Sequence, residues 1–310
     1  MLKEIPNGVY PTMITPFTEE GKVDYEALAV LIEWYIKNGV DGLFAVCQSS
    51  EMFQLTREES ISIAKFVVEK VRGRVTVIAS GHISDTLDEQ AKELELMAQT
   101  GIDALVLITN RLAAKEEGDD IWYQRLEKLI DSIPKDILLG FYECPYPYKR
   151  LLSPEILKKC IQNERFAFLK DTCCERDQIQ QKLAIIKGTS FKLYNANSGT
   201  LLESLKDGAN GFSGVMANFH PDLYAWLCKH YDEESPDVRE IADFIELASV
   251  IETRAYPVCA KYAMQLQGLP LTLYTRKQPS SDLIETFKCE TEALVRLTEI
   301  YRKKIGRHLY

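Results

Sequence analysis

Lys170 ends a short apolar run, Phe166-Ala167-Phe168-Leu169-Lys170-Asp171, that has the composition of a buried strand. An amine at the end of such a strand can be partly desolvated, which favours its neutral form. A neutral amine can attack a ketone and form a Schiff base. A solvated, inert lysine at the edge of a strand is the alternative. Which of these two roles Lys170 has depends on the strands and helices that surround this run.

Two other segments carry groups that would complete this chemistry. Tyr142 ends an earlier apolar run and is a candidate general acid and base. The turn Gln48-Ser49-Ser50-Glu51 offers hydroxyls and backbone N–H groups that can hold a carboxylate. With Lys170, these groups would bind a 2-oxo acid, form an imine at its ketone and move protons as a carbon–carbon bond forms or breaks. A buried structural tyrosine and an ordinary polar turn are the alternatives.

Eight short apolar runs alternate with helical patterns along the first three quarters of the chain. They lack sustained polar–apolar alternation, which is typical of parallel strands covered on both faces. The runs begin near Gly8, Gly42, Thr76, Ala104, Ile137, Phe166, Phe191 and Gly211. We therefore predict a (β/α)8 TIM barrel over residues 1–232, in which functional side chains lie where strands end. A doubly wound open sheet is the alternative.

Helix starts and the C-terminal quarter complete this prediction. Residues able to cap a helix N-terminus precede several of the helical patterns. They are Asp24, Thr56, Thr86, Ser153 and Ser235. From residue 233 to residue 310 only helical patterns remain, and we expect a C-terminal helical extension packed on the barrel. A small separate domain is the alternative, but no flexible linker precedes this part.

Composition narrows the possible partners. The chain has 310 residues and a formal net charge of -9, which argues against nucleic-acid binding, and it has no apolar run long enough to span a membrane. Its eight cysteines and four histidines show no metal-ligand spacing. We expect free thiols, a cytoplasmic location, no metal ion and no cofactor.

With these residues in this order, the chain resembles the dihydrodipicolinate synthase / N-acetylneuraminate lyase family of class I aldolases. The resemblance covers roughly residues 6–275, and the 28-residue separation of Tyr142 and Lys170 is typical of the family. The matching segments are residues 8–17, 47–51, 141–145, 169–172, 211–218 and 256–263. The order and spacing of these segments carry the resemblance more than any one of them does.

The resemblance implies a role for each matching residue. Lys170 would form the imine with pyruvate or a related 2-oxo acid, Tyr142 would transfer protons, and Ser49 and Ser50 would bind the carboxylate. It also implies a homo-oligomer, either a dimer or a tetramer. Ser213 follows the predicted eighth strand and is a further candidate for substrate binding.

Departures from the family pattern bear on the substrate. Pro147 stands where the synthases carry a carboxylate-binding arginine, Gln48 replaces their relay hydroxyl, and residues 108–112 lack their relay tyrosine. Ser198-Gly199 stands where sialic acid lyases often carry Asp-Glu. These changes favour a hydroxylated or acidic 2-oxo acid and a sugar-acid-type aldolase, lyase or dehydratase.

The expected pocket would be lined by polar groups from several strand ends. The candidates are Gln48, Asn110, Arg111, Glu143, Asn197 and Ser198. Arg111 is the candidate for a second substrate carboxylate, because a guanidinium can pair with one in a bidentate way. Glu143 is either an acid–base partner or a structural ion-pair residue. Two functional alternatives stay open: a 4-hydroxy-tetrahydrodipicolinate synthase with an altered proton relay, and a non-catalytic barrel that binds a small acid.

Overall fold

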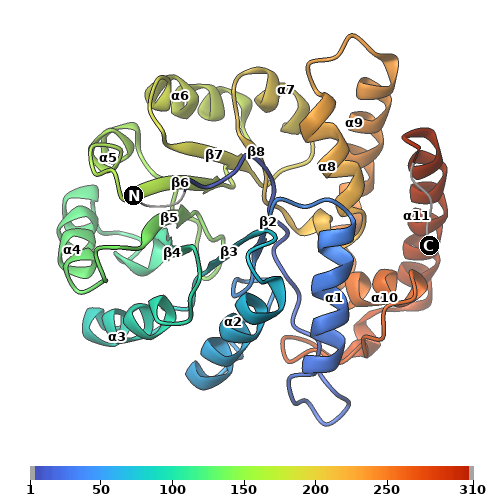
Figure 1. Ribbon diagram of the computed structural model, residues 1–310, viewed down its shortest axis with the longest axis horizontal. Helices are drawn as coiled ribbons and strands as arrows, with labels where there is room; N and C mark the ends of the chain where they lie inside the picture. Colours follow the sequence, from blue (N-terminus) through green and yellow to red (C-terminus); the bar gives the residue numbers. More distant parts are fainter. Residues whose placement is uncertain (1–3, 307–310) are drawn as a thin grey trace.

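Eight parallel strands form a nearly closed barrel in the computed structural model, which describes residues 4–306 (Figure 1). The strands are β1 (Gly8–Val9), β2 (Gly42–Phe44), β3 (Thr76–Ala79), β4 (Ala104–Ile108), β5 (Leu138–Tyr142), β6 (Phe166–Asp171), β7 (Lys192–Asn195) and β8 (Gly211–Phe212). Their order is β1-β8-β7-β6-β5-β4-β3-β2. A parallel bridge between Thr12 and Phe44 joins the segment after β1 to β2. The predicted (β/α)8 barrel is therefore confirmed.

Eight helices alternate with the strands and surround them, as Figure 1 shows. They are α1 (Tyr25–Lys37), α2 (Arg57–Val71), α3 (Leu87–Ala98), α4 (Asp119–Asp131), α5 (Pro154–Cys160), α6 (Arg176–Ile186), α7 (Leu201–Lys206) and α8 (Pro221–His230). Asp24, Thr56, Thr86 and Ser153 cap the N-termini of four of them, as predicted. The capping box is reciprocal at Thr56 and Glu59, whereas the Glu89 carboxylate pairs with Arg57 instead of returning to its cap.

The register of the central strands determines where the chemistry can occur. Tyr142 on β5 is the parallel partner of Lys170 on β6, and Gly140 is the partner of Phe168 one pleat below. A Cβ atom on Gly140 would lie 2.2 Å from the Phe168 ring, so only glycine leaves room for this ring inside the barrel. Side chains two residues apart on a strand share a face. Lys170 therefore points the same way as Phe168, above the packed interior.

The C-terminal part is helical, as predicted, and lies on one side of the barrel near α1 and α8 (Figure 1). It comprises α9 (Pro236–Ala248), η3 (Ser249–Thr253), α10 (Val258–Leu266), η4 (Ser280–Asp282) and α11 (Glu285–Lys304). Ser235 caps α9. Arg302 on α11 pairs with Asp222 on α8 at 2.8 Å, and both side chains are buried. No helix among residues 4–306 combines the length and the apolar character that crossing a membrane requires.

Candidate active site

A cavity of about 410 Å³ lies at the carboxyl ends of the strands and contains the side chains of Lys170 and Tyr142. Most of its wall comes from the segments that follow β1, β2, β5, β6, β7 and β8. The C-terminal part supplies the remainder, namely Glu252, Thr253, Tyr256, Pro257 and Lys277. The site is therefore built by the barrel and the C-terminal part together.

Lys170 carries a desolvated amine. Its side chain is 4% exposed, and its Nζ lies 4.3 Å from the centre of the Tyr142 ring. Burial lowers the pKa of the amine from 10.5 to about 8, although the nearby thiols of Cys47 and Cys144 act in the opposite direction. About a tenth of the Lys170 amines are then neutral at pH 7. This fraction makes Lys170 a competent nucleophile toward a ketone.

Tyr142 places a protonated phenol beside this amine. Its hydroxyl donates to Gln48 Oε1 at 3.3 Å, and the Cys144 thiol lies 3.4 Å from the same oxygen. Burial raises the pKa of Tyr142 well above 10, so the phenol keeps its proton at neutral pH. A phenol in this state can donate a proton to an oxygen that develops charge during attack by the amine.

In the turn after β2, Ser49 faces the cavity, whereas the Ser50 side chain bonds to the backbone of the turn itself. Gln48 and Ser49 line the cavity, and the Ser49 hydroxyl donates to Thr12 Oγ1 at 3.1 Å. The Ser50 hydroxyl donates to the Cys47 carbonyl at 2.8 Å and accepts from the Cys47 N–H at 2.7 Å. Ser50 thus shapes the turn with its side chain, which leaves its backbone as its means of binding an anion.

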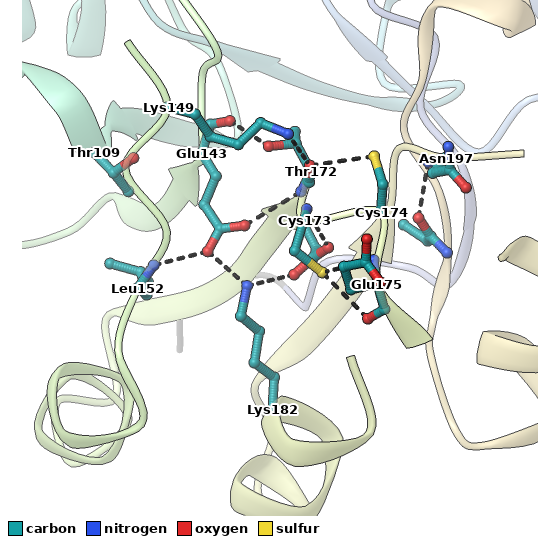
Figure 2. Close-up of polar contacts among 12 residues, drawn as sticks. Thr109, Glu143, Lys149, Leu152, Thr172, Cys173, Cys174, Glu175, Lys182 and Asn197 are labelled. Atoms are coloured by element: carbon teal, nitrogen blue, oxygen red, sulfur yellow. Dashed lines mark hydrogen bonds and ion pairs between the residues drawn. The ribbon is translucent and has the colours of Figure 1, made fainter. Parts of the chain in front are cut away.

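Glu143 lies outside the cavity, in the layer between the barrel and α6 (Figure 2). Because Tyr142 points into the barrel, the alternation of the strand turns the next residue outward. The Glu143 carboxylate accepts hydrogen bonds from the Leu152 and Thr172 N–H groups and from Lys182 Nζ at 2.7 Å. Burial raises the pKa of Glu143, against the lowering effect of Lys182.

Arg111 and Asn110 also lie outside the cavity lining. The Arg111 guanidinium donates to the carbonyls of Ile83 (2.6 Å) and Ser84 (3.0 Å) and pairs with Asp85. It thereby fixes the loop before α3 instead of facing Lys170. The Asn110 amide donates to three carbonyls of residues 144–148, so it holds the loop that follows β5.

Of the remaining predicted residues, one lines the cavity and two do not. Asn197 lines the cavity, with its amide oxygen held by the Thr200 N–H at 3.0 Å. Ser198 and Ser213 are buried and do not line the cavity. The Ser198 hydroxyl contacts Tyr224 at 2.6 Å, and the Ser213 hydroxyl donates to the Tyr10 carbonyl at 2.9 Å.

Several lining residues escaped sequence reasoning. Lys149 reaches the cavity from the loop after β5 and donates to the Thr172 carbonyl at 2.7 Å (Figure 2). Glu252, Tyr256 and Lys277 come from the C-terminal part. A search confined to strand ends cannot find these three, because no sequence spacing relates them to the strands. Tyr256 opens one of the segments that resemble the family, and this was its only signal.

The arrangement supports imine chemistry at Lys170. It combines a partly neutral amine, a phenol on the adjacent strand and hydroxyls on the turn after β2. Within residues 4–306, no three His, Cys, Asp or Glu side chains are grouped so as to hold a metal ion. The barrel and its amine have the form of a class I aldolase, a lyase that works through a Schiff base.

The chain belongs to the dihydrodipicolinate synthetase family, whose family model matches residues 5–297. A 4-hydroxy-tetrahydrodipicolinate synthase of Acetivibrio thermocellus is 30% identical over 292 residues, which cover 89% of this chain and 95% of that enzyme. A synthase of the same name from a Thermoanaerobacter species is 32% identical over 267 residues, covering 83% of this chain and 85% of its own.

Solved structures agree on the fold. YagE, a prophage protein of the dihydrodipicolinic acid synthase family from E. coli K12 in complex with pyruvate, superposes with a TM-score of 0.85 at 24% identity. The match covers 94% of this chain and 98% of YagE. Membership of this family makes the protein a lyase of the class I aldolase type, and the family evidence does not favour a non-catalytic binding barrel.

Proposed function

We propose that this protein forms a Schiff base between Lys170 and pyruvate or a related 2-oxo acid, with Tyr142 as a proton-transfer residue. The observation that carries the proposal is the buried Lys170 amine, whose pKa is about 8 and whose register partner on β5 is Tyr142. The pyruvate bound in the YagE structure and the names of the curated relatives support this substrate class.

The first chemical step follows from this geometry. The neutral Lys170 amine attacks C2 of the 2-oxo acid, and the ketone oxygen takes up the proton that the Tyr142 phenol can supply. The attacking nitrogen returns one proton to Tyr142, and a second proton, taken from solvent, converts the new hydroxyl to water. Its departure leaves the protonated imine, whose nitrogen keeps the other amine proton. Ser49 and Ser50 lie on the turn that would hold the substrate carboxylate through its backbone N–H groups, since the Ser49 hydroxyl proton is directed to Thr12.

The wider cavity favours a polar second part of the substrate. Asn197, Lys149, Glu252 and Lys277 line it beyond the Lys170–Tyr142 pair. Amides, ammonium groups and a carboxylate suit hydroxyl or acidic groups better than apolar ones. We therefore propose a sugar-acid-type substrate, with cleavage or formation of a carbon–carbon bond or loss of water.

Trapping with borohydride tests the imine directly. The protein is incubated with pyruvate, reduced and weighed by mass spectrometry, and peptide mapping locates the modified residue. We expect one reduced pyruvate on Lys170 and none in Lys170→Ala. Lys149→Ala is the matched control, because it removes another lysine that lines the same cavity but is not the partner of Tyr142. An adduct that persists in Lys170→Ala overturns the proposal.

A second candidate is the condensation of pyruvate with aspartate semialdehyde, which the names of the relatives suggest. Gln48 and Pro147 occupy positions where the resemblance leads one to expect a relay hydroxyl and a carboxylate-binding arginine. We therefore expect slow condensation compared with cleavage of hydroxylated 2-oxo acids. Rapid turnover of aspartate semialdehyde would show that the altered relay still supports synthase activity.

We propose a cytoplasmic homo-oligomer, as is usual in the family, although a neighbouring structure is described as a monomeric dihydrodipicolinate synthase variant. All eight cysteines are free thiols, which suits a reducing compartment. Light scattering on the protein as it elutes from a size-exclusion column measures its molar mass and therefore the number of subunits.

A further inference from the structure

Tyr256 brings a second phenol into the cavity from the C-terminal part. It precedes α10 and lines the same cavity as Lys170 and Tyr142. Its hydroxyl accepts a hydrogen bond from Asn218 Nδ2 at 2.9 Å. Asn218 is itself fixed, because its amide also donates to the Thr12 carbonyl at 2.9 Å. The hydroxyl proton of Tyr256 is therefore free to be donated elsewhere.

Two further hydroxyls continue from Tyr256. The Ser49 hydroxyl lines the cavity beside Tyr256 and partly offsets the effect of burial on the Tyr256 pKa, and its own proton is directed to Thr12 Oγ1 at 3.1 Å. Tyr256, Ser49 and Thr12 all line the cavity. Each can donate one proton and accept another, so the three groups in series can carry a proton along the cavity wall between Tyr256 and water that enters the cavity at Thr12.

Tyr142 has different partners. Its hydroxyl donates to Gln48 Oε1, and an amide oxygen accepts a hydrogen bond but has no proton to pass on. The thiol next to it, Cys144, has a pKa raised to about 11 by burial. Among residues 4–306, the contacts of the Tyr142 hydroxyl thus do not continue into a chain of hydroxyls.

We propose that Tyr256 is a second catalytic acid–base residue, which exchanges a proton with C3 of the 2-oxo acid bound to Lys170. Ser49 and Thr12 carry this proton between Tyr256 and solvent. Tyr142 then serves the oxygen at C2 during imine formation. This division of labour rests on the proposed Schiff-base function and adds a separate step to it.

The proton and electron balance of this step is simple. In the protonated imine, the C3–H bond breaks and its electron pair forms the C2–C3 double bond. The former C–N π electrons become a lone pair on nitrogen, which gives a neutral enamine. The C3 proton passes to the Tyr256 oxygen as the phenol proton moves to Ser49, the Ser49 proton to Thr12 and the Thr12 proton to water. The reverse transfer returns one proton to C3.

Burial explains why the transfer needs a chain of hydroxyls. It raises the pKa of Tyr256 well above 10, so a stored phenolate is unfavourable. A phenol that receives a proton must therefore release its own proton in the same step. The Ser49 hydroxyl beside it in the cavity, which donates to Thr12, provides that exit.

Pyruvate alone is sufficient to test the inference, through two readouts. Borohydride trapping reports imine formation at Lys170. Exchange of the pyruvate methyl hydrogens in D2O, followed by proton NMR, also requires proton transfer at C3. We expect Tyr256→Phe to keep the trapping rate within about threefold of the wild type and to lower the exchange rate at least about 100-fold. Tyr262→Phe is the matched control, because its hydroxyl bonds to Glu292 at 2.7 Å outside the cavity lining.

Each outcome has a distinct meaning. Absence of trapping in the wild type refutes the proposed function, whereas normal exchange in Tyr256→Phe refutes only the inference. A parallel loss of trapping and exchange assigns Tyr256 to imine formation and also overturns the role at C3. If Tyr256→Phe does not fold, Thr12→Val cuts the chain at its other end. We expect it to lower exchange at least about tenfold with trapping retained, and unchanged exchange would contradict the proposal.

Discussion

At the scale of single residues, the reactivity of Lys170 comes from its buried position near the carboxyl end of β6. The ammonium is enclosed by the Tyr142 ring and by the thiols of Cys47 and Cys144, none of which is a strong counter-charge. Desolvation therefore outweighs the favourable electrostatic contacts, and the pKa falls to about 8. A carboxylate in direct contact would have kept the amine charged.

This pKa predicts the pH profile of imine formation. Only the neutral amine attacks, so the rate should rise about tenfold from pH 6 to pH 7 and level off above about pH 8. An amine with the ordinary pKa of 10.5 would instead continue to gain rate up to about pH 10. Rapid mixing with pyruvate, a borohydride quench and mass spectrometry give the rate at each pH. A rate that still rises beyond pH 9 would show that Lys170 is not desolvated in the working enzyme.

Individual residues also show how far sequence reasoning reaches. Lys170 and Tyr142 could be predicted because both lie at the carboxyl ends of strands and both point inward. Glu143 could have been placed outside the cavity by the same alternation, since it follows an inward residue. Arg111 was not predictable in this way. Its long side chain turns back to the Ile83 and Ser84 carbonyls, a contact that depends on the packing of two loops.

At the scale of elements, β5 and β6 are held in register from outside as well as from inside the barrel. Lys182 on α6 contacts Glu143, which follows β5 (Figure 2). It also contacts Asp171, which ends β6. One ammonium thus bridges the two strands directly behind the Tyr142–Lys170 pair. The sequence predicted both strands and the helix, but not this bridge, because it joins residues 39 and 11 positions apart through tertiary packing.

Removing this ammonium should destabilise the barrel. Lys182→Met keeps the length of the side chain but leaves two buried carboxylates without their cation, and we expect a loss of roughly 3–5 kcal/mol in the free energy of unfolding. Urea denaturation measures it. Lys187→Met, at an exposed position just after α6, should change stability by no more than about 0.5 kcal/mol. Adding Glu143→Gln and Asp171→Asn to Lys182→Met should recover part of the loss, and no recovery would argue against an electrostatic cause.

At the scale of the whole molecule, the site is completed by a part of the chain that lies outside the eight strand–helix units. Tyr256, Glu252 and Lys277 reach the cavity from the C-terminal helical part. The sequence predicted this part as a helical extension, and its helices were visible as periodic patterns. Its contribution to the site was not visible, because it depends on how these helices dock against the barrel.

One buried carboxylate joins the two parts at the site. Glu51, on the turn after β2, accepts hydrogen bonds from the N–H groups of Arg276 (2.6 Å) and Lys277 (2.8 Å). Its other oxygen lies 3.7 Å from Lys261 Nζ on α10. The turn that carries Ser49 and the segment that brings Lys277 to the cavity are therefore positioned by the same group.

Glu51→Gln should loosen both segments together. The amide keeps the shape of the side chain but leaves Lys261 buried without a counter-charge. Because the amine can then give up its proton, we expect a loss of roughly 1–2 kcal/mol in the free energy of unfolding at pH 7. Burial already lowers the pKa of Lys261 to about 8, so the loss should shrink above pH 8, where the amine is neutral in either protein.

Hydrogen exchange should increase at residues 47–51 and 275–278 alike. Glu59→Gln, which weakens a half-buried pair with the Arg276 side chain and keeps an acceptor oxygen for the capping box of α2, should lose no more than about 1 kcal/mol. Faster exchange in one segment alone would show that Glu51 does not couple them.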